Sequence, residues 1–587
     1  MLTHISIENF KGIRERVDLE LKPITLLFGP NNAGKSTILH ALLYAQEVFE
    51  RHNLNADRTA TGGPFNDLGG FHRMVHGHDL TQPIKLGFQF NLDEDDFPPY
   101  EHDADAFETV LETKADQLIE KLTSAKISVT IRWPERAEPA GPIVESCVIE
   151  LNSRDFAEIT FDDTSRQRRL KLLALDHPVF RRPYGEPDDE RNSAGQPPRG
   201  HFPYKKAGNR DRSEISHDDP LYCAESPLSE PASIFASAFD EVSSLLKGNV
   251  EDGLLLPSRE QDDALPRADA SVGFVQTLYG RSGRDALGRI RDRFLKSSIR
   301  TPHLSSVDIE LSMQRMAFDI AGLLNKIVTN ALQALRRRLR DFRYLGPVRE
   351  IPSRISAAPE TPDPSRWSTG LGAWDHLQSC DGKFVEEVSD WLSNPGRLNA
   401  GVRLNRRNLI PLDLAQKVLA DLPSRRPSSK SLDNAAKQLA ALPAERRVFL
   451  VPNDSEIELS LHDVGVGISQ LIPVVVTALD ESAKLAAIEE PEYHLHPRLQ
   501  ADVADLFVAA ARIHGKQCLI ELHSEHVILR LQRLIREGKL APGELSVNVV
   551  RRIASATRID ALRLDQDGDF LDDWPGGFFP ERLRELL

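Results

Sequence analysis

The chain has 587 residues and a formal net charge of −15, with 40% apolar and 27% charged residues. This length predicts two or more structural lobes, and the composition is that of a globular protein. No apolar run approaches the roughly 18 residues that a membrane-spanning helix needs, so we expect no membrane segment. The acidic balance argues against DNA binding through overall charge, because contact with phosphates would need a local basic patch.

The cysteines and the opening segment indicate the compartment. Cys147, Cys223, Cys380 and Cys518 lie far apart and show no metal-ligand spacing. They therefore predict neither a disulfide framework nor a zinc site. The opening sequence MLTHISIENFKG alternates like a strand and lacks the long apolar core of a signal peptide. We expect a cytoplasmic protein.

The first third of the chain is rich in strand patterns. The continuous apolar run Ile24–Phe28 predicts a buried central strand, and residues 37–49 have helical spacing. Period-two alternation without long intervening helices predicts an antiparallel sheet. It occurs at residues 5–7, 17–21, 84–92, 127–133, 147–151 and 170–175. Residues 107–122 predict one helix within this region.

The middle of the chain is polar and then helical, and the last part returns to strand–helix alternation typical of an open α/β sheet. Residues 180–220 predict a solvated loop or a disordered insertion, and residues 233–342 are mainly helical. A proline-rich break at 351–367 leads to mixed helical segments up to about residue 447. We therefore expect an ATPase N-lobe at 1–95, a β-rich subdomain at 96–180, a polar and mainly helical insertion at 181–445 and a C-lobe at 446–587.

A phosphate-binding loop follows the first buried strand, where GPNNAGKS fits G-x-x-x-x-G-K-[ST]. Glycines let the backbone N–H groups surround the β-phosphate, and the following helix adds its positive end. Lys35 would neutralise the β- and γ-phosphates, and Ser36 would offer a hydroxyl to Mg²⁺. A glycine-rich turn that binds nothing is the alternative. The predicted nucleotide-binding residues are Asn31, Asn32, Ala33, Gly34, Lys35, Ser36 and Thr37.

Two later strands end in residues suited to catalysis. Glu489 and Glu490 follow a short apolar strand, where one carboxylate can hold Mg²⁺ and the next can polarise an attacking water. We assign Glu489 and Ser36 to the metal and Glu490 to catalysis as the base. A solvated helix start is the alternative. The following strand ends at His523, which we expect to contact the γ-phosphate.

A second anion site precedes the glutamates, in VGVGISQL. Gly467 and Ser469 open an apolar helix there, and a helix N-terminus of this composition binds anions. Glycine and serine also cap helices that bind nothing. Because the chain already has one phosphate loop, this site predicts a nucleotide held by another protomer. We therefore expect a homodimer or a higher homo-oligomer.

In this order the motifs resemble the ABC-type ATPases of the SMC, RecF and OLD branch. IENFKGIRE with GPNNAGKST is similar to the N-lobe of that branch, VGVGISQLIPV to its variant signature helix, AAIEEPEYHLHP to its Walker B strand and IELHSEH to its histidine switch. The stretch YLGPVR resembles a segment of AAA-family ATPases from prokaryotic phage-defence operons. The resemblance implies an α/β P-loop head with an antiparallel β subdomain and a large, mainly helical insertion. It also implies ATP and Mg²⁺ as cofactors, and a dimer with two ATP molecules between its subunits.

The chain departs from that branch at several positions. Glu489 stands where most ABC proteins carry aspartate, and Glu521 and Leu522 replace the threonines that often precede the switch histidine. Gln82 and Gln89 are both candidates for the Q-loop glutamine. The insertion has no heptads of an SMC coiled coil, and the sequence after the histidine switch lacks the acidic set of an OLD Toprim nuclease.

These patterns predict a Mg²⁺-dependent ATPase whose nucleotide-driven dimerisation regulates a partner effector protein in anti-phage defence. The alternative is a RecF-like DNA-associated ATPase in DNA repair. Arg336, Arg337, Arg338, Arg340 and Arg343 would provide its basic patch for nucleic acid. The same arginines also suit a helix C-terminus, where they complement the dipole.

Overall fold

The computed structural model divides into two compact units, one of Met1–Asn91, Lys126–Cys147 and Leu332–Leu587, the other of Leu92–Ala125 and Val148–Ala331. The predicted polar loop at 180–220 and most of the predicted helix at 107–122 lie outside the described residues. The structure describes residues 1–56, 67–97, 119–134, 141–162, 167–174, 177, 254–255, 306–353, 363–422, 428–553 and 556–579.

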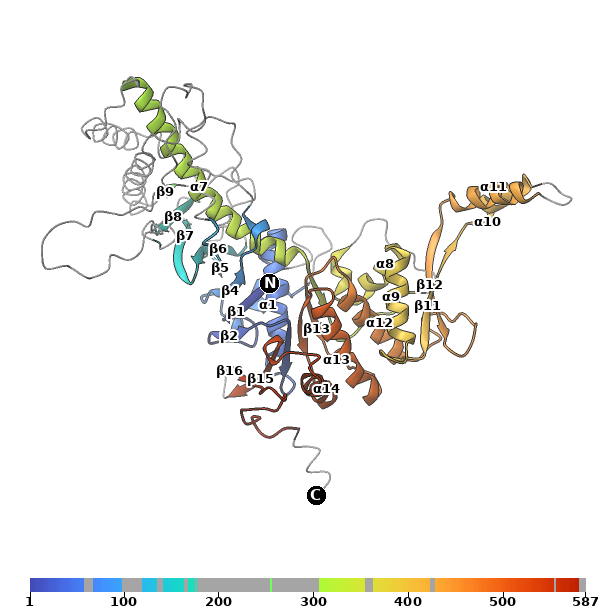
Figure 1. Ribbon diagram of the computed structural model, residues 1–587. Coiled ribbons are helices and arrows are strands. Elements are labelled where there is room, and N and C mark those ends of the chain that lie inside the picture. Colours follow the sequence, from blue (N-terminus) through green and yellow to red (C-terminus); the bar gives the residue numbers. More distant parts are fainter. Residues whose placement is uncertain are drawn as a thin grey trace, which may run out of the picture. The chain divides into compact units, whose positions relative to one another are not determined.

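A six-stranded sheet forms the centre of the first unit (Figure 1). Its first five strands are parallel, and the last is antiparallel to its neighbour. In order across the sheet the strands are β10 (Phe342–Leu345), β13 (Leu485–Glu489), β14 (Gln517–Glu521), β3 (Ile24–Phe28), β15 (Leu545–Ile553) and β16 (Ala556–Leu562). Every residue of β3, β13 and β14 is buried, which explains their continuous apolar runs. The carboxyl ends of parallel strands meet at one edge, where such sheets bind ligands.

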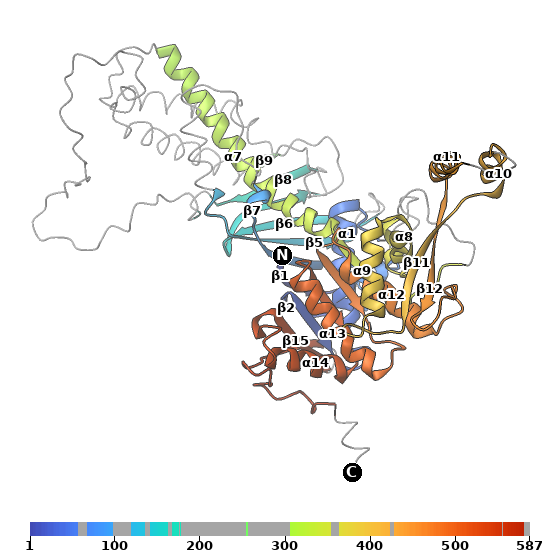
Figure 2. The same cartoon turned by 45° about the vertical axis from the view of Figure 1, so that its right-hand side comes forward.

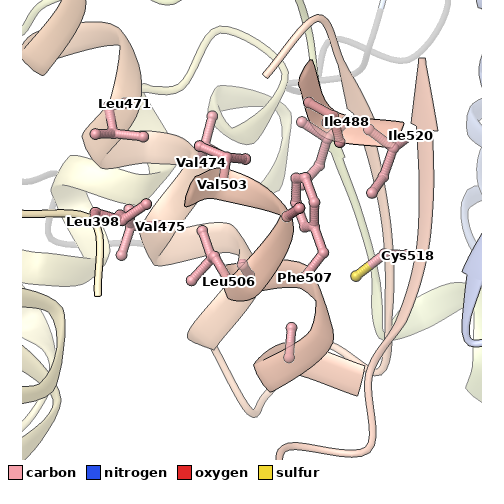
Figure 3. Close-up of a cluster of buried hydrophobic side chains, with 14 of the residues drawn as sticks. Leu398, Leu471, Val474, Val475, Ile488, Val503, Leu506, Phe507, Cys518 and Ile520 are labelled. Atoms are coloured by element: carbon pink, nitrogen blue, oxygen red, sulfur yellow. The ribbon is translucent and has the colours of Figure 1, made fainter. Parts of the chain in front are cut away.

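Helices cover this sheet. They are α1 (Lys35–Arg51), α12 (Val466–Leu479), α13 (Pro497–Arg512) and α14 (Glu525–Arg536). Pro497 stands in the first turn of α13, where a missing N–H costs nothing, and the Ser524 hydroxyl caps α14 by accepting from the N–H of His526. Phe507 of α13 lies against Ile488 and Ile520 of the sheet in the main core (Figure 3). Helices α13 and α14 lie side by side (Figure 2).

The predicted antiparallel strands are present. In the first unit β1 (Leu2–Glu8) pairs with β2 (Val17–Glu20) and with β4 (Ile84–Asn91), and β5 (Ser124–Arg132) follows β4. Alternate residues of β5 are buried, as period-two patterning requires. The remaining strands of this group are β6 (Ile143–Leu151), β7 (Arg154–Asp162), β8 (Gln167–Leu173) and β9 (Leu254–Leu255), of which the last three lie in the second unit. The sequence patterns missed β7.

The long helix α7 (Ser306–Arg340) confirms the last part of the helical pattern predicted at residues 233–342, and strand β10 begins at Phe342. Most of the earlier part of that pattern lies outside the described residues. None of the described helices is long and apolar enough to cross a membrane. Short helical segments complete the described chain: α2 (Phe71–Met74), η1 (His76–His78), η2 (Glu94–Asp96), η4 (Pro364–Trp367) and η5 (Pro542–Glu544).

The region expected to be mixed helical up to residue 447 contains two strands. After α8 (Leu371–Ser379) and α9 (Gly382–Ser393), strand β11 (Val402–Leu409) pairs antiparallel with β12 (Glu445–Pro452). Between them stand α10 (Leu412–Ala420) and α11 (Ser429–Ala440), at the far end of the paired strands (Figures 1 and 2). We call this β11–α10–α11–β12 segment the arm. The sequence did not predict these strands because asparagines and arginines, which do not indicate a strand, make up much of β11.

Candidate nucleotide site

The phosphate loop connects β3, which ends at Phe28, to α1, which begins at Lys35. Gly29 has φ +142° and Gly34 has φ +109°, in the region that glycine tolerates. A Cβ on Gly29 would lie 2.1 Å from the carbonyl oxygen of Val550, so a side chain is also excluded by space. The structure thus has the strand–loop–helix arrangement that the motif requires. Within the loop Asn31 and Asn32 are exposed and Ala33 is buried, and Ser36 and Thr37 lie half-buried in the first turn of α1.

The Lys35 ammonium is bound within the loop itself. It donates to the carbonyl oxygens of Gly29 at 2.8 Å and Pro30 at 3.1 Å, and it lies 3.5 Å from Oε1 of Glu521. Burial lowers the pKa of Lys35 below its ordinary value, while the Glu521 carboxylate opposes that shift. On nucleotide binding, the Lys35 ammonium would therefore exchange these internal partners for phosphate oxygens.

The carboxyl edge of the sheet brings the predicted catalytic groups to this loop. The Ser36 hydroxyl donates to Oε2 of Glu521 at 2.7 Å. Nε2 of His523 lies 3.6 Å from Oε1 of Glu490 and 4.0 Å from Oε1 of Glu521. Lys35, Ser36, Glu490 and His523, which stand in three separate parts of the sequence, therefore meet at one place.

Glu521 is a member of this cluster that the sequence patterns missed. They treated it only as a replacement for a threonine, yet its carboxylate contacts both Lys35 and Ser36. Burial raises the pKa of Glu521 above its usual range, and the hydrogen bond from Ser36 opposes the shift. One ligand atom from each of Glu490, Glu521 and His523 lies within 4.8 Å of the others. The available signal was its position at the end of a strand, directly before His523.

Glu489, the predicted metal ligand, lies in a different environment. Its carboxylate accepts from the hydroxyl of Tyr344 at 2.7 Å and lies 3.5 Å from Nε2 of His40. Burial raises the pKa of Glu489 to about 7. In the described part of the chain, the carboxylate that contacts Ser36 is that of Glu521. The role of Glu489 in metal binding stays a prediction.

Glu490 has an unusual backbone conformation for a residue with a side chain. Its φ is +41°, in the left-handed region. Its N–H donates to the carbonyl of Glu521 at 3.0 Å, so the turn after β13 is tied to the end of β14. Nearby, the N–H of His523 donates to Oε1 of Glu492 at 2.5 Å, which fixes the start of the histidine segment. The Glu490 and His523 side chains are therefore held on neighbouring turns.

The signature-like segment stands apart from these contacts. Ser469 is 1% exposed, and its hydroxyl donates to the carbonyl of Leu461 at 3.2 Å. A Cβ on Gly467 would lie 2.7 Å from the carbonyl oxygen of His494, so this glycine permits close packing. No contact among the described residues joins Gly467 or Ser469 to the phosphate loop of the same chain. The arrangement is compatible with the prediction that they serve another protomer, which remains untested.

Neither candidate for the Q-loop glutamine joins the site. Gln82 lies in a turn, where its N–H donates to the carbonyl of Asp79 at 3.1 Å. Gln89 lies in β4, paired with His4 of β1. In the described chain neither side chain has a contact with the cluster around Ser36, so the assignment between them stays open.

A cavity of about 550 Å³ opens beside His523 at the carboxyl ends of β3, β14 and β15. Its wall combines aromatic rings with two arginines, of which Arg551 pairs with Asp560 at 2.6 Å. The lining residues are Phe28, Gly29, Pro30, Leu522, His523, Val549, Arg551, Arg552, Trp574, Pro575, Gly576, Gly577 and Phe579. Open space therefore reaches the predicted phosphate-sensing histidine.

Comparisons with known proteins found partial similarities. The RecF DNA replication and repair protein of Roseiflexus castenholzii is 50% identical over 44 residues, which is 7% of this chain and 11% of that protein. The chain thus spans about a tenth of that relative's length. An Smc head bound to the C-winged helix domain of ScpA aligns over 96% of this chain and 98% of its own, with 10% identity and a TM-score of 0.34. The SMC head domain from Thermotoga maritima aligns over 96% and 99%, with 8% identity and a TM-score of 0.32.

The family model described as an AAA ATPase domain matches two separate parts of the chain, residues 1–138 and 382–528. The first part contains the phosphate loop, and the second contains α12, the two glutamates and His523. The unmatched stretch between them, residues 139–381, overlaps the predicted insertion at 181–445 only in part, since the second matched part begins at residue 382. The two matched parts together make up a little under half of the chain, which is similar there to an AAA ATPase domain.

Proposed function

We propose that this chain binds ATP with Mg²⁺ at the phosphate loop and hydrolyses it with Glu490 as the base. The observation that carries the proposal is the meeting of Lys35, Ser36, Glu490 and His523 at one edge of the sheet. The Glu490 carboxylate would accept a proton from the attacking water. Lys35 would bind the β- and γ-phosphates, and His523 would contact the γ-phosphate. Burial, together with the Lys35 charge, lowers the pKa of His523, which favours a neutral ring at that contact.

The donor set fits Mg²⁺. Magnesium prefers oxygen ligands, and the Ser36 hydroxyl and the Glu521 carboxylate lie 2.7 Å apart at the start of α1. Glu490 adds a second carboxylate within reach of this pair. When bound there, the ion would neutralise charge on the nucleotide phosphates. Ser36 and Glu521 are the residues that we propose hold it, with Glu489 as the competing prediction.

Two matched substitutions separate these carboxylates. If Glu521 holds the metal, Glu521→Gln should raise the Mg²⁺ concentration for half-maximal ATPase activity by about tenfold or more, since a neutral amide binds Mg²⁺ poorly. Glu489→Gln should then change it little, because Tyr344 and His40 surround that carboxylate. Titration of activity with Mg²⁺ checks both. The reverse ranking would return the metal to Glu489.

The composite site is the second part of the proposal: two copies of the chain meet so that α12 of one covers the nucleotide of the other. Ser469 is too buried for a direct test, because a large side chain there would disturb its packing. Val466, at the start of the same helix, is 51% exposed. Val466→Arg should lower turnover by about tenfold, because it disturbs the contact between α12 and the partner's nucleotide. It should leave ATP affinity unchanged, because the phosphate loop of a single chain provides the binding contacts.

Ile513→Arg is the control, since Ile513 is 74% exposed and lies just beyond α13. It should change neither turnover nor affinity. The two measurements are steady-state hydrolysis and equilibrium binding of a fluorescent ATP analogue. Equal loss of affinity and turnover in Val466→Arg would argue for a site completed within one chain.

We further propose that this ATPase regulates a partner effector protein in anti-phage defence. The arm supports a docking role because its helices expose Leu412, Leu419 and Leu432 by 70%, 47% and 48%. ATP can shift a partner's affinity only through a difference between the two nucleotide states. The test is whether a chain that keeps ATP bound captures that partner. Glu490→Gln, which removes the Glu490 carboxylate, would provide such a chain.

A RecF-like role on DNA is the alternative, favoured by the 44-residue stretch that is 50% identical to RecF. The proposed basic patch supports it poorly. Arg336 lies 3.4 Å from Glu50, Arg338 donates to the carbonyl of Asn91, and Arg343 stacks over Trp367. Salt-dependent DNA binding by the purified chain, with a linear loss of log affinity against log salt, would favour this alternative.

A further inference from the structure

Arg349 lies behind the turn that carries Glu490. Its side chain is buried, with 2% of the residue exposed, and Nη2 donates to the carbonyl oxygens of Glu489 at 2.5 Å and Glu490 at 3.2 Å. A guanidinium bonded to two successive carbonyls fixes the direction of both peptide units. The arginine therefore constrains the backbone from which the proposed base projects, without touching the site where a nucleotide would bind.

The backbone of Arg349 is tied in turn to the signature-like helix α12. Its N–H donates to Oε1 of Gln470 at 3.1 Å, and Nε2 of Gln470 donates back to the Arg349 carbonyl at 2.7 Å. Gln470 is 6% exposed and directly follows Ser469. The pair of bonds makes Gln470 and Arg349 one unit, so a displacement of α12 at this point is passed to the guanidinium.

A gain in folding stability does not explain why an arginine occupies this buried position. Its Nε and Nη1 atoms have no hydrogen-bond partner among the described residues. A buried cation with unmet donors is costly, and an apolar side chain of similar volume would avoid that cost. Glu490, meanwhile, keeps φ at +41°, a strained conformation that persists only where its surroundings enforce it. The bonds from Arg349 to this turn, together with the bond from the Glu490 N–H to Glu521, are the contacts that hold it.

We propose that Arg349 is a positioning residue for hydrolysis, which holds the Glu489–Glu490 turn in its active orientation and, through Gln470, makes that orientation depend on the position of α12. The inference rests on the proposed role of Glu490. In a dimer, α12 is the helix that would meet the partner's nucleotide. When α12 of one protomer contacts the partner's nucleotide, the change would therefore be transmitted to Glu490 of the first protomer, beside its own nucleotide.

The test compares Arg349→Met, Arg349→Lys and Gln470→Ala in the full chain. Loss of the charged hydrogen bonds should lower kcat by about tenfold to a hundredfold in Arg349→Met, while KM and the affinity for a fluorescent ATP analogue stay within about twofold. Arg349→Lys keeps one charged donor and should recover part of kcat. Gln470→Ala should lower kcat less, because it leaves the guanidinium in place.

Arg343→Lys is the matched control. Arg343 stands six positions earlier, is largely buried and lies 3.8 Å from Asp480, away from the glutamate turn. Its substitution should leave kcat unchanged. A purely structural role for Arg349 would lower the melting temperature without separating kcat from KM, and that result overturns the inference. If Arg349→Met does not fold, Arg349→Lys and Gln470→Ala decide the matter by the same split.

The outcomes also distinguish this inference from the function on which it rests. A wild-type chain that hydrolyses ATP, with folded variants that hydrolyse it equally well, would refute the positioning role alone. A wild-type chain that binds no ATP and releases no phosphate would refute the proposed function, and the inference with it.

Discussion

Glu490→Gln should bind ATP like the wild type and hydrolyse it at least about a hundredfold more slowly. General-base catalysis contributes roughly 10²- to 10⁴-fold, and an amide cannot accept the proton from water. The substitution preserves shape, so the strained turn and its bonds to Arg349 and Glu521 should remain. Phosphate release under single-turnover conditions, together with ATP binding at equilibrium, measures the two effects separately.

Glu544→Gln is the control for Glu490→Gln, because Glu544 is a surface carboxylate paired with Arg512 at 2.7 Å. It should leave hydrolysis unchanged. The Glu490→Gln chain should also accumulate with ATP bound, and purification from its native operon should then retain more of the proposed partner than the wild type does. A chain that purifies alone in both forms and still protects cells would contradict a partner. Hydrolysis at the wild-type rate would show that Glu490 is not the base.

Lys35→Ala should weaken ATP binding by roughly a hundredfold or more. The substitution removes a buried cation that, in the proposed site, would face the phosphates, and charged hydrogen bonds of this kind contribute about 1.5–3 kcal/mol each. Lys35 is 3% exposed and is the one cationic residue in the GPNNAGKS sequence of the loop. Isothermal titration with ATP and Mg²⁺ measures the loss, and hydrolysis should fall with it.

Folding must be separated from binding in that experiment, because Lys35 also bonds the carbonyls of Gly29 and Pro30. Circular dichroism and a melting curve of Lys35→Ala serve this purpose. Lys85→Ala is the control, since Lys85 is half exposed and pairs with Glu8 in the antiparallel strands. Unchanged ATP affinity in a folded Lys35→Ala chain would exclude the phosphate loop as the nucleotide site.

The elements that the sequence predicted are those in which local chemistry suffices. A phosphate loop needs glycines, a lysine and a serine at fixed spacing, and Gly29, Gly34, Lys35 and Ser36 carry that pattern. The strands β3, β13 and β14 were recognisable because complete burial demands continuous apolar residues. The paired strands of the arm were not. Their pattern is weak because asparagines and arginines make up much of β11, in which only Val402 and Leu404 are buried.

The tertiary structure alone decided which carboxylate meets Ser36. In sequence, Glu489 and Glu490 follow the strand that motif reasoning links to the phosphate loop, while Glu521 follows a later one. In the structure β14 lies between β13 and β3, so Glu521 lies next to the loop, while the metal role of Glu489 stays a prediction. Strand order depends on long-range pairing of strands that lie hundreds of residues apart, which no local pattern encodes. The hydrogen bonds from Arg349 to the Glu489–Glu490 turn likewise form only when β10 pairs with β13.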